Sequence, residues 1–310
     1  MRRLTLLLPA GTRFKGMALP VEVACALGRG DRKMHAPGDE AQLARHFRLL
    51  PDRWSHAALT RLMDADPAEV RTRAWLRADP AHVRPDINGV RLLATGGMLG
   101  LDASDAHALL PALRPLFGDA GFTLDAPHPA RWYLRLPREA RLPAFSTPDV
   151  ALGDDVFEHT PDTPEARRWR ALLSEAQVVL HNHPHNAARL AAGKVAINSL
   201  WFWGGGTLPD HVTANHPTLY SDDVLLHGLA RVGTLHAMPP CDFADVAADA
   251  LVDLRNLRDA ASIFERWLLP ACRRTTPHET VFDFADGQVI ILVPTQRWRF
   301  WRRPLTKLVA

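Results

Sequence analysis

The chain has 310 residues, of which 47% are hydrophobic and 23% charged, and its formal net charge is +3 at pH 7. This composition is typical of a globular protein and excludes disordered and collagen-like chains, and so small a net charge does not favour a nucleic-acid partner. No apolar run approaches the roughly 18 residues that a membrane-spanning helix needs. Three widely spaced cysteines predict reduced, buried thiols, and the lack of a signal-peptide cleavage site predicts a cytoplasmic protein.

The N-terminal part of the chain predicts a strand followed by helices. Leu4 to Leu8 is a short apolar run closed by Pro9-Ala10-Gly11, which is typical of a strand buried on both faces of a parallel sheet. Apolar residues then recur at helical spacing from Leu19 to Leu27 and again from Glu40 to Leu50.

The next segment predicts a smaller α+β arrangement. Asn-Gly in the run Asp86 to Val90 predicts a tight hairpin, because both residues tolerate a positive φ. Asp102 predicts the start of a helix toward Leu110, which Pro111 and Pro115 should break or kink. Two further strands are expected at 122–124 and 131–136.

Residues 149–161, rich in Asp, Pro and Gly, predict a linker or surface loop. Thr163 and Pro164 then predict the start of an amphipathic helix. A second short helix is expected from Pro184 to Ala192, ended by Gly193, and a strand from Val195 to Trp203.

The C-terminal third predicts a helix and a β-ribbon. Apolar residues from Phe243 to Leu268 follow helical spacing and predict one long helix that Pro270 ends, while Asp286-Gly287 predicts a second hairpin. Asp245, Asp249 and Asp253 would share one face of that helix, and a solvated face explains them better than a cation site. Ser221-Asp222-Asp223 predicts another helix start.

The densest group of chemically capable residues lies between His181 and Gly206. A helix N-terminus attracts anions, an arginine can clamp a phosphate or carboxylate, and glycines let a ligand approach the backbone. The predicted ligand-binding residues of this block are His181, His183, Asn186, Arg189, Asn198, Trp201, Trp203, Gly204, Gly205 and Gly206. The alternative is structural: the histidines cap a buried turn and the tryptophans lie in the core.

Metal binding by the block is disfavoured. Pro184 prevents an ordinary i, i+4 histidine pair among His181, His183 and His185, and no carboxylate stands close by in sequence. We therefore predict no metal ligands and assign no catalytic residue.

Two further segments could bind anions. Arg77 and Arg84 stand in a proline-containing run with His82, and they either grip an anion or are neutralised by Asp79 and Asp86. The tail from Arg297 to Arg303 interleaves arginines with aromatic residues. It predicts either a docking surface for RNA, anionic lipid or an acidic partner, or an edge strand with stacked arginines.

The central block resembles a known family. It resembles the "HPxN…R…GK…N…W.WG.G…LP" block of archaeal-type cofactor-independent phosphoglycerate mutases of the alkaline phosphatase superfamily. The matching residues are His183-Pro184-His185-Asn186, Arg189, Gly193, Asn198, Trp201, the run from Trp203 to Gly206, and Leu208-Pro209. The chain also resembles a bacterial group described either as phosphoglycerate mutase or as RpfE-type regulatory protein. The resemblance implies an α/β fold with a mostly parallel sheet flanked by helices, formed by residues 1–66 and 150–310, and an inserted α+β subdomain at 67–149.

The same resemblance indicates lost catalytic groups. In those mutases the first strand ends in Pro-Asp-Gly, whose aspartate binds metal, whereas this chain has Pro9-Ala10-Gly11. Their nucleophilic serine lies in Pro-Gly-Ser-Asp, and the nearest match here, Pro37-Gly38-Asp39-Glu40, has no serine. Phosphoryl transfer through a phosphoenzyme needs both an activated nucleophile and metal ions.

The resemblance therefore implies a catalytically degenerate protein that binds a phosphorylated small molecule or a protein partner in a regulatory role. No cofactor is expected. The first alternative is an active phosphoglycerate mutase or phosphatase, which would need a divalent metal such as Mn²⁺. The second alternative is an interaction protein that uses the Arg/Trp-rich tail.

Overall fold

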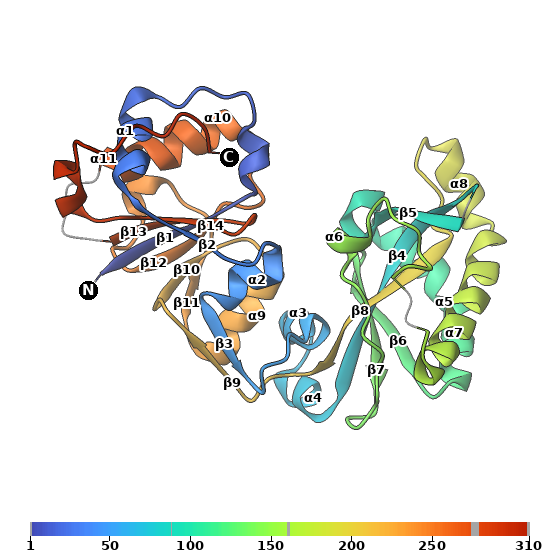
Figure 1. The fold of residues 1–310 in the computed structure, drawn as a ribbon. Helices are drawn as coiled ribbons and strands as arrows, with labels where there is room; N and C mark the ends of the chain where they lie inside the picture. The colour runs from blue at the N-terminus through green and yellow to red at the C-terminus, as the bar shows by residue number, and fades with distance from the viewer. Residues whose placement is uncertain (1, 88, 160–161, 274–278, 309–310) are drawn as a thin grey trace. The chain divides into compact units, whose positions relative to one another are not determined.

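The computed structural model describes residues 2–87, 89–159, 162–273 and 279–308. The chain divides into two compact units: a terminal unit, Met1–Asp52 with Asp210–Ala310, and a middle unit, Arg53–Pro209 (Figure 1). The boundaries that the sequence predicted, near residues 66 and 150, both fall inside the middle unit. The reason is that a strand at 199–207 pairs with the sheet of this unit. A helix that begins at residue 164 belongs to the same unit.

The terminal unit is built on a seven-stranded, mostly parallel sheet, which confirms the predicted fold class. Its strand order is β11-β10-β12-β1-β13-β14-β2, parallel from β11 to β13 and antiparallel from β13 to β2. The strands are β1 (Arg3–Leu8), β2 (Asp31–Met34), β10 (Thr218–Tyr220), β11 (His236–Met238), β12 (Ala250–Asp253), β13 (Glu279–Phe284) and β14 (Gln288–Leu292). The predicted first strand is confirmed, and its apolar run is buried because β1 lies at the centre of the sheet. The hairpin at Asp286-Gly287 is also confirmed.

Helices cover both faces of this sheet. Figure 1 shows α1 (Val21–Arg29), α10 (Ala260–Ile263) and α11 (Leu269–Arg273) on one face, and α2 (Asp39–Ala44) and α9 (Val224–Gly233) on the other. Short 3-10 turns lie at Gly11–Phe14, Phe243–Asp245 and Pro294–Trp298, and β3 (Phe47–Leu50) pairs with β9 (His211–Ala214) in a separate ribbon. The predicted helix from Glu40 to Leu50 was wrong in its second half, which forms β3. The three cysteines are free, as expected, but half-buried.

The long helix predicted from Phe243 to Leu268 was wrong. Ala250–Asp253 forms β12 between β10 and β1, where its apolar side chains are buried. A short apolar run fits a buried strand and one turn of a buried helix equally well, so the spacing could not separate them. The helix begins only after Asp259, whose side chain caps α10, and a π-helical turn, Phe264–Leu268, carries it through Pro270 into α11.

The middle unit contains an antiparallel sheet of order β5-β4-β7-β6, with β8 paired to β4. Its strands are β4 (Ala74–Asp86), β5 (Gly89–Thr95), β6 (Thr123–His128), β7 (Arg131–Leu136) and β8 (Ser199–Thr207). The predicted strands at 122–124 and 131–136 are confirmed. The first hairpin is confirmed by the pairing of β4 with β5, although Asn88 lies outside the described residues.

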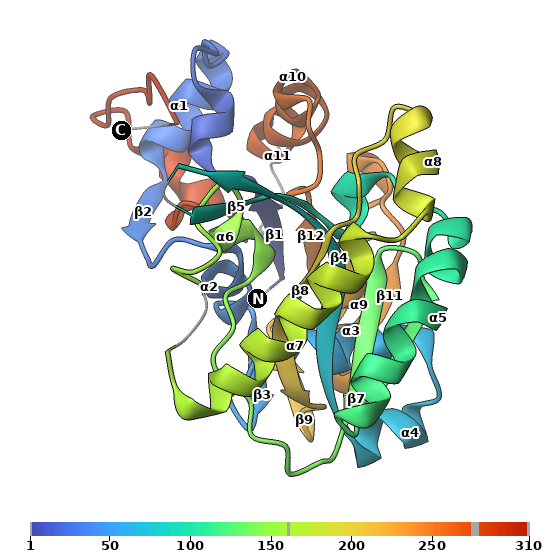
Figure 2. The same cartoon turned by 90° about the vertical axis from the view of Figure 1, so that its right-hand side faces the viewer.

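Two long helices, α5 (Ala103–Asp119) and α7 (Pro164–His181), lie side by side on the sheet of the middle unit (Figure 2). The predicted caps are confirmed, since Asp102 forms a capping box and the Thr163 side chain accepts from Ala166 N. The predicted break in α5 was wrong: Pro111 and Pro115 lie on its exposed face, and burial of its apolar face maintains the helix.

The remaining helices of the middle unit are short. They are α3 (His56–Asp64), which packs against β8, α4 (Pro67–Thr72), the 3-10 turn Gly96–Leu99, α6 (Pro148–Ala151) and α8 (His185–Ala191). The last confirms the predicted second helix, and Gly193 follows it with φ 71°. The predicted loop at 149–161 contains the end of α6, and its residues 160 and 161 lie outside the described residues.

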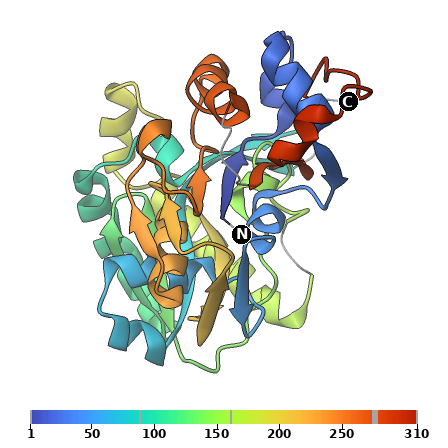
Figure 3. The ribbon, with the colours of Figure 1, turned by 90° about the vertical axis from the view of Figure 1, so that its left-hand side faces the viewer.

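The C-terminal segment runs beside α1 in the terminal unit (Figure 3). Leu305 N donates to Ala24 O (2.8 Å), and Leu308 is 4% exposed. No helix among the described residues is long and apolar enough to cross a membrane.

Candidate functional site

The predicted block from His181 to Gly206 lies in the middle unit, at the end of α7, in α8 and along β8. Its arginine is buried: Arg189 donates from Nη1 to Asp105 Oδ2 (2.7 Å), from Nη2 to Leu99 O (2.8 Å) and from Nε to Val195 O (2.9 Å). The ion pair joins two side chains that are 2% and 3% exposed. These bonds occupy both arms of the guanidinium inside the fold, so Arg189 ties α8 to α5.

The two asparagines of the block bond to backbone. Asn186 Nδ2 donates to Leu180 O (2.7 Å) and Ile197 O (2.9 Å), and its Oδ1 accepts from Ile197 N (2.8 Å). Asn198 bonds both the N–H and the carbonyl of Val83, each at 2.8 Å. Both amides thus join separate segments of the middle unit through their hydrogen bonds.

The histidines of the block lie nearer the surface than Asn186 and Arg189 do. His181 is exposed, and His183 Nδ1 accepts from the backbone N–H of His185, the first residue of α8 (3.2 Å). His185 Nε2 contacts Asp105 Oδ1 at 2.7 Å. Hydrogen bonds from Asp102 N, His185 and Arg189 outweigh the effect of burial, and the pKa of Asp105 is lowered.

Two of the three glycines, Gly204 and Gly206, allow close packing of the start of α3 on β8. Gly204 has φ 63°, and a Cβ there would lie 2.8 Å from His56 Cβ. A Cβ at Gly205 would meet Leu142 at 2.4 Å, and Gly206, with φ 147°, faces Ser55. The space that the sequence suggested for a ligand is therefore filled by side chains of the same unit.

The structure brings Trp203 and Arg77 together around one carboxylate, Asp79. Arg77 Nε donates to Asp79 Oδ1 (2.9 Å) and Trp203 Nε1 donates to Asp79 Oδ2 (2.8 Å). The Arg77 guanidinium also faces the rings of Tyr133 and Trp203, 5.2 Å and 5.1 Å from their centroids. Trp201 is buried separately and donates to Ser146 O (3.0 Å), whereas Arg84 is exposed near the end of β4. Ligand binding by these predicted residues stays a prediction.

A cluster that was not predicted as a site lies at the carboxyl ends of β10 and β12, the edge of a parallel sheet where ligands commonly bind. Asp253 accepts from Arg255 Nε (2.8 Å), Arg255 Nη2 (3.0 Å) and Ser221 Oγ (3.1 Å). Arg255 Nη2 also contacts Asp223 Oδ2 at 3.2 Å. The helix start predicted at Ser221-Asp222-Asp223 is confirmed, because Asp223 caps α9. A cavity of about 370 Å³ adjoins the cluster, and Asp222, Asp253 and Asn256 are among its lining residues.

A second buried network lies along β1 and β13. Asp283 accepts from Arg45 Nη2 (2.6 Å) and Nε (2.9 Å) and contacts His46 Nε2 at 2.7 Å. Burial raises the pKa of Asp283, but the bonds from Arg45 and His46 outweigh it and hold that pKa below its usual value. The His216 ring bridges Thr5 Oγ1 and Asp249 Oδ1, each at 2.9 Å. Asp249 and Asp253 therefore do not share the solvated helix face that the sequence predicted.

These carboxylates do not fit a divalent metal. Across 2–87, 89–159, 162–273 and 279–308, no three His, Cys, Asp or Glu side chains are grouped so that they could hold a metal ion. Asp253 and Asp283 are each 1% exposed and are already bonded by arginine. A guanidinium supplies the positive charge that a metal would otherwise supply.

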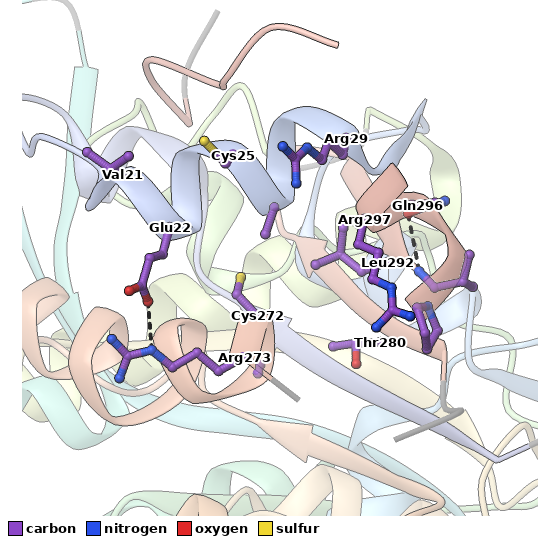
Figure 4. A pocket seen from close by; sticks show the side chains of 14 residues that line it. Val21, Glu22, Cys25, Arg29, Cys272, Arg273, Thr280, Leu292, Gln296 and Arg297 are labelled. Carbon is purple, nitrogen blue, oxygen red and sulfur yellow. Dashed lines mark hydrogen bonds and ion pairs between the residues drawn. The ribbon is translucent and has the colours of Figure 1, made fainter. Parts of the chain in front are cut away.

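A cavity of about 490 Å³ lies between α1, α11, β14 and the turn at Pro294–Trp298 (Figure 4). At one end Arg273 Nε donates to Glu22 Oε2 (2.7 Å), and at the other Arg29 and Arg297 line the wall. Within the described part of the chain, neither Arg29 nor Arg297 forms an ion pair. Burial raises the pKa of the lining Cys272 thiol to about 12, so that it stays protonated at neutral pH.

Comparison with known proteins relates one segment of the chain to mutases. No protein-family model matches. A probable 2,3-bisphosphoglycerate-independent phosphoglycerate mutase of Geobacter sulfurreducens is 44% identical over 57 residues, 18% of this chain and 14% of that protein. The corresponding mutase of Methanosarcina barkeri is 34% identical over 62 residues, 20% of this chain and 16% of that protein.

Two solved structures align along most of the chain. The cofactor-independent phosphoglycerate mutase of Thermoplasma acidophilum has a TM-score of 0.38 and 16% identity, covering 94% of this chain and 90% of that one. The PH0037 protein of Pyrococcus horikoshii has a TM-score of 0.48 and 11% identity, covering 94% and 87%. The predicted resemblance to cofactor-independent mutases is thus confirmed for a local segment by sequence, and the matched segments span only 14% and 16% of those curated relatives.

Proposed function

We propose that this chain is a mutase-like protein that binds a phosphorylated metabolite without transferring its phosphoryl group, and that it acts in regulation. The observation that carries the proposal is the pairing of buried carboxylates with arginines in the parallel sheet. Asp253 and Asp283, on the strands either side of β1, are held by Arg255 and Arg45.

This pairing argues against phosphoryl transfer. A phosphoenzyme mechanism needs a free nucleophile and cations that neutralise the charge developing on the phosphoryl group. Ser221 Oγ donates to Asp253 Oδ2 (3.1 Å) and accepts from Asp223 N (2.9 Å). Its hydroxyl group is therefore already a hydrogen-bond donor and acceptor within the fold. Freeing Asp253 or Asp283 would break the charge-assisted hydrogen bonds that Arg255 and Arg45 donate to these buried carboxylates, which is unfavourable.

The cavity lined by Arg29 and Arg297 supports the binding part of the proposal. Its volume of about 490 Å³ lies in the range of small-molecule sites. Two guanidinium groups on one wall, neither in an ion pair among the described residues, suit a phosphate, which accepts bidentate hydrogen bonds from arginine. The apolar side chains of Val21, Ala26 and Leu292 also line the cavity and would contact the rest of the metabolite.

Isothermal titration with 3-phosphoglycerate and with inorganic phosphate tests this proposal. We expect saturable binding of 3-phosphoglycerate to the wild-type protein. Arg29→Gln and Arg297→Gln should each raise Kd by about tenfold or more, because each removes a charge-assisted hydrogen bond worth roughly 1.5–3 kcal/mol.

Arg13→Gln is the matched control, since Arg13 is an exposed arginine of the same unit that does not line this cavity. Its Kd should equal that of the wild type. If neither anion binds saturably, or if all three variants bind like the wild type, the cavity is not the site and the binding role is refuted there.

A further inference from the structure

The C-terminal segment, residues 294–308, displays large aromatic side chains to solvent. Trp298, Phe300 and Trp301 are 65%, 80% and 67% exposed. Single exposed apolar residues are common on proteins, but a contiguous group of large ones marks an interaction site. The alternative of an edge strand was wrong, because this stretch forms a 3-10 turn, Pro294–Trp298, and then irregular backbone.

The fold holds this segment in place at both ends. Upstream, Asp31 accepts from Gln296 Nε2 (3.0 Å) and pairs with Arg299. Downstream, the backbone docks on α1 so closely that a Cβ at Gly28 would lie 2.4 Å from Arg303 O. The aromatic side chains between these anchors are therefore presented by an ordered backbone.

The segment is also strongly basic. Arg302, Arg303 and Lys307 are exposed, and no Asp or Glu occurs between residues 287 and 310. Arg299 forms an ion pair with Asp31 within the fold. Arg302, Arg303 and Lys307 form no ion pair with any residue that the structure describes, so an anionic partner could contact them.

We propose that Trp298, Phe300, Trp301, Arg302 and Arg303 form a surface that binds the headgroup region of an anionic lipid bilayer. Tryptophan and phenylalanine partition into the membrane interface, and nearby arginines are attracted to anionic headgroups. The ring geometry favours lipid over nucleic acid. Arg297 covers one face of Trp298 at 5.0 Å, and Phe300 and Trp301 meet edge to face with centroids 5.4 Å apart, so the rings offer apolar edges more than open faces for bases.

Co-sedimentation with vesicles tests the proposal. The full-length protein should bind vesicles of phosphatidylcholine and phosphatidylglycerol in equal parts, and should bind pure phosphatidylcholine vesicles far less. Arg302→Gln with Arg303→Gln should lower the partition coefficient about 30-fold, the equivalent of roughly 1 kcal/mol for each cation. Trp298→Ala with Phe300→Ala and Trp301→Ala should lower it by about tenfold or more.

A triple variant in the middle unit is the control. Ile87→Ala, Phe157→Ala and Leu190→Ala remove three large side chains that are 96%, 64% and 62% exposed, and this variant should bind like the wild type. Failure of the wild type to bind anionic vesicles, or equal binding by the aromatic and control variants, would overturn the proposal. So would binding of a single-stranded oligonucleotide in place of vesicles.

Discussion

Replacing Arg189 by methionine is expected to lower the free energy of unfolding of the middle unit by about 3–5 kcal/mol. The change keeps most of the side-chain volume but leaves the Asp105 carboxylate, 3% exposed, without its guanidinium. It also leaves the carbonyls of Leu99 and Val195 without donors. Urea unfolding followed by tryptophan fluorescence measures the loss.

Lys194→Ala is the control for this prediction. Lys194 pairs with Asp102 at 3.0 Å in an exposed position, and the loss of such a pair should cost less than about 1 kcal/mol. If Arg189→Met were as stable as the wild type but lost 3-phosphoglycerate binding, Arg189 would be a ligand group, as the resemblance to the mutases implied.

Acidification from pH 6.5 to pH 4 is expected to remove roughly 3 kcal/mol of stability through His56 alone. Burial lowers the pKa of His56 from 6.5 to about 4. The unfolded chain therefore takes up a proton near pH 6.5, while the folded chain resists protonation until about pH 4. The contribution of His56 is complete above pH 6.5 and is lost as the pH falls through this window.

The measurement is the free energy of unfolding at pH 7, 6, 5 and 4 for the wild type and for His56→Phe, which keeps an aromatic ring beside Trp203. The variant should show a shallower fall in stability between pH 6.5 and 4. His107→Phe, at an exposed position on α5, should retain the wild-type slope. Identical slopes for the wild type and His56→Phe would show that burial does not suppress ionisation at this position.

Local signals predicted much of the fold. The apolar run Leu4 to Leu8, the caps at Asp102 and Thr163, and the Asp286-Gly287 turn all act through neighbouring residues, and each is confirmed. The strand Ala250–Asp253 could not be predicted in the same way. Its identity depends on pairing with β1 and β10, which are distant in sequence.

The roles of the candidate site residues depend still more on distant partners. Arg189 pairs with Asp105, 84 positions away, and Asn198 bonds Val83, 115 positions away. A sequence pattern of arginine, asparagine and glycine is compatible with both a phosphate site and a buried clamp, and only tertiary contacts separate them. The Ser221-Asp223 signal was interpreted correctly as a helix start, but nothing local indicated Arg255 as its neighbour.

The most direct test of the proposed function is an enolase-coupled assay of 3-phosphoglycerate conversion to 2-phosphoglycerate by the purified protein, with and without Mn²⁺. We expect no turnover above the protein-free control in either condition, because Asp253 and Asp283 are held by Arg255 and Arg45. A Mn²⁺-dependent turnover that rises in proportion to protein concentration would contradict this, and would show that the chain is an active phosphoglycerate mutase.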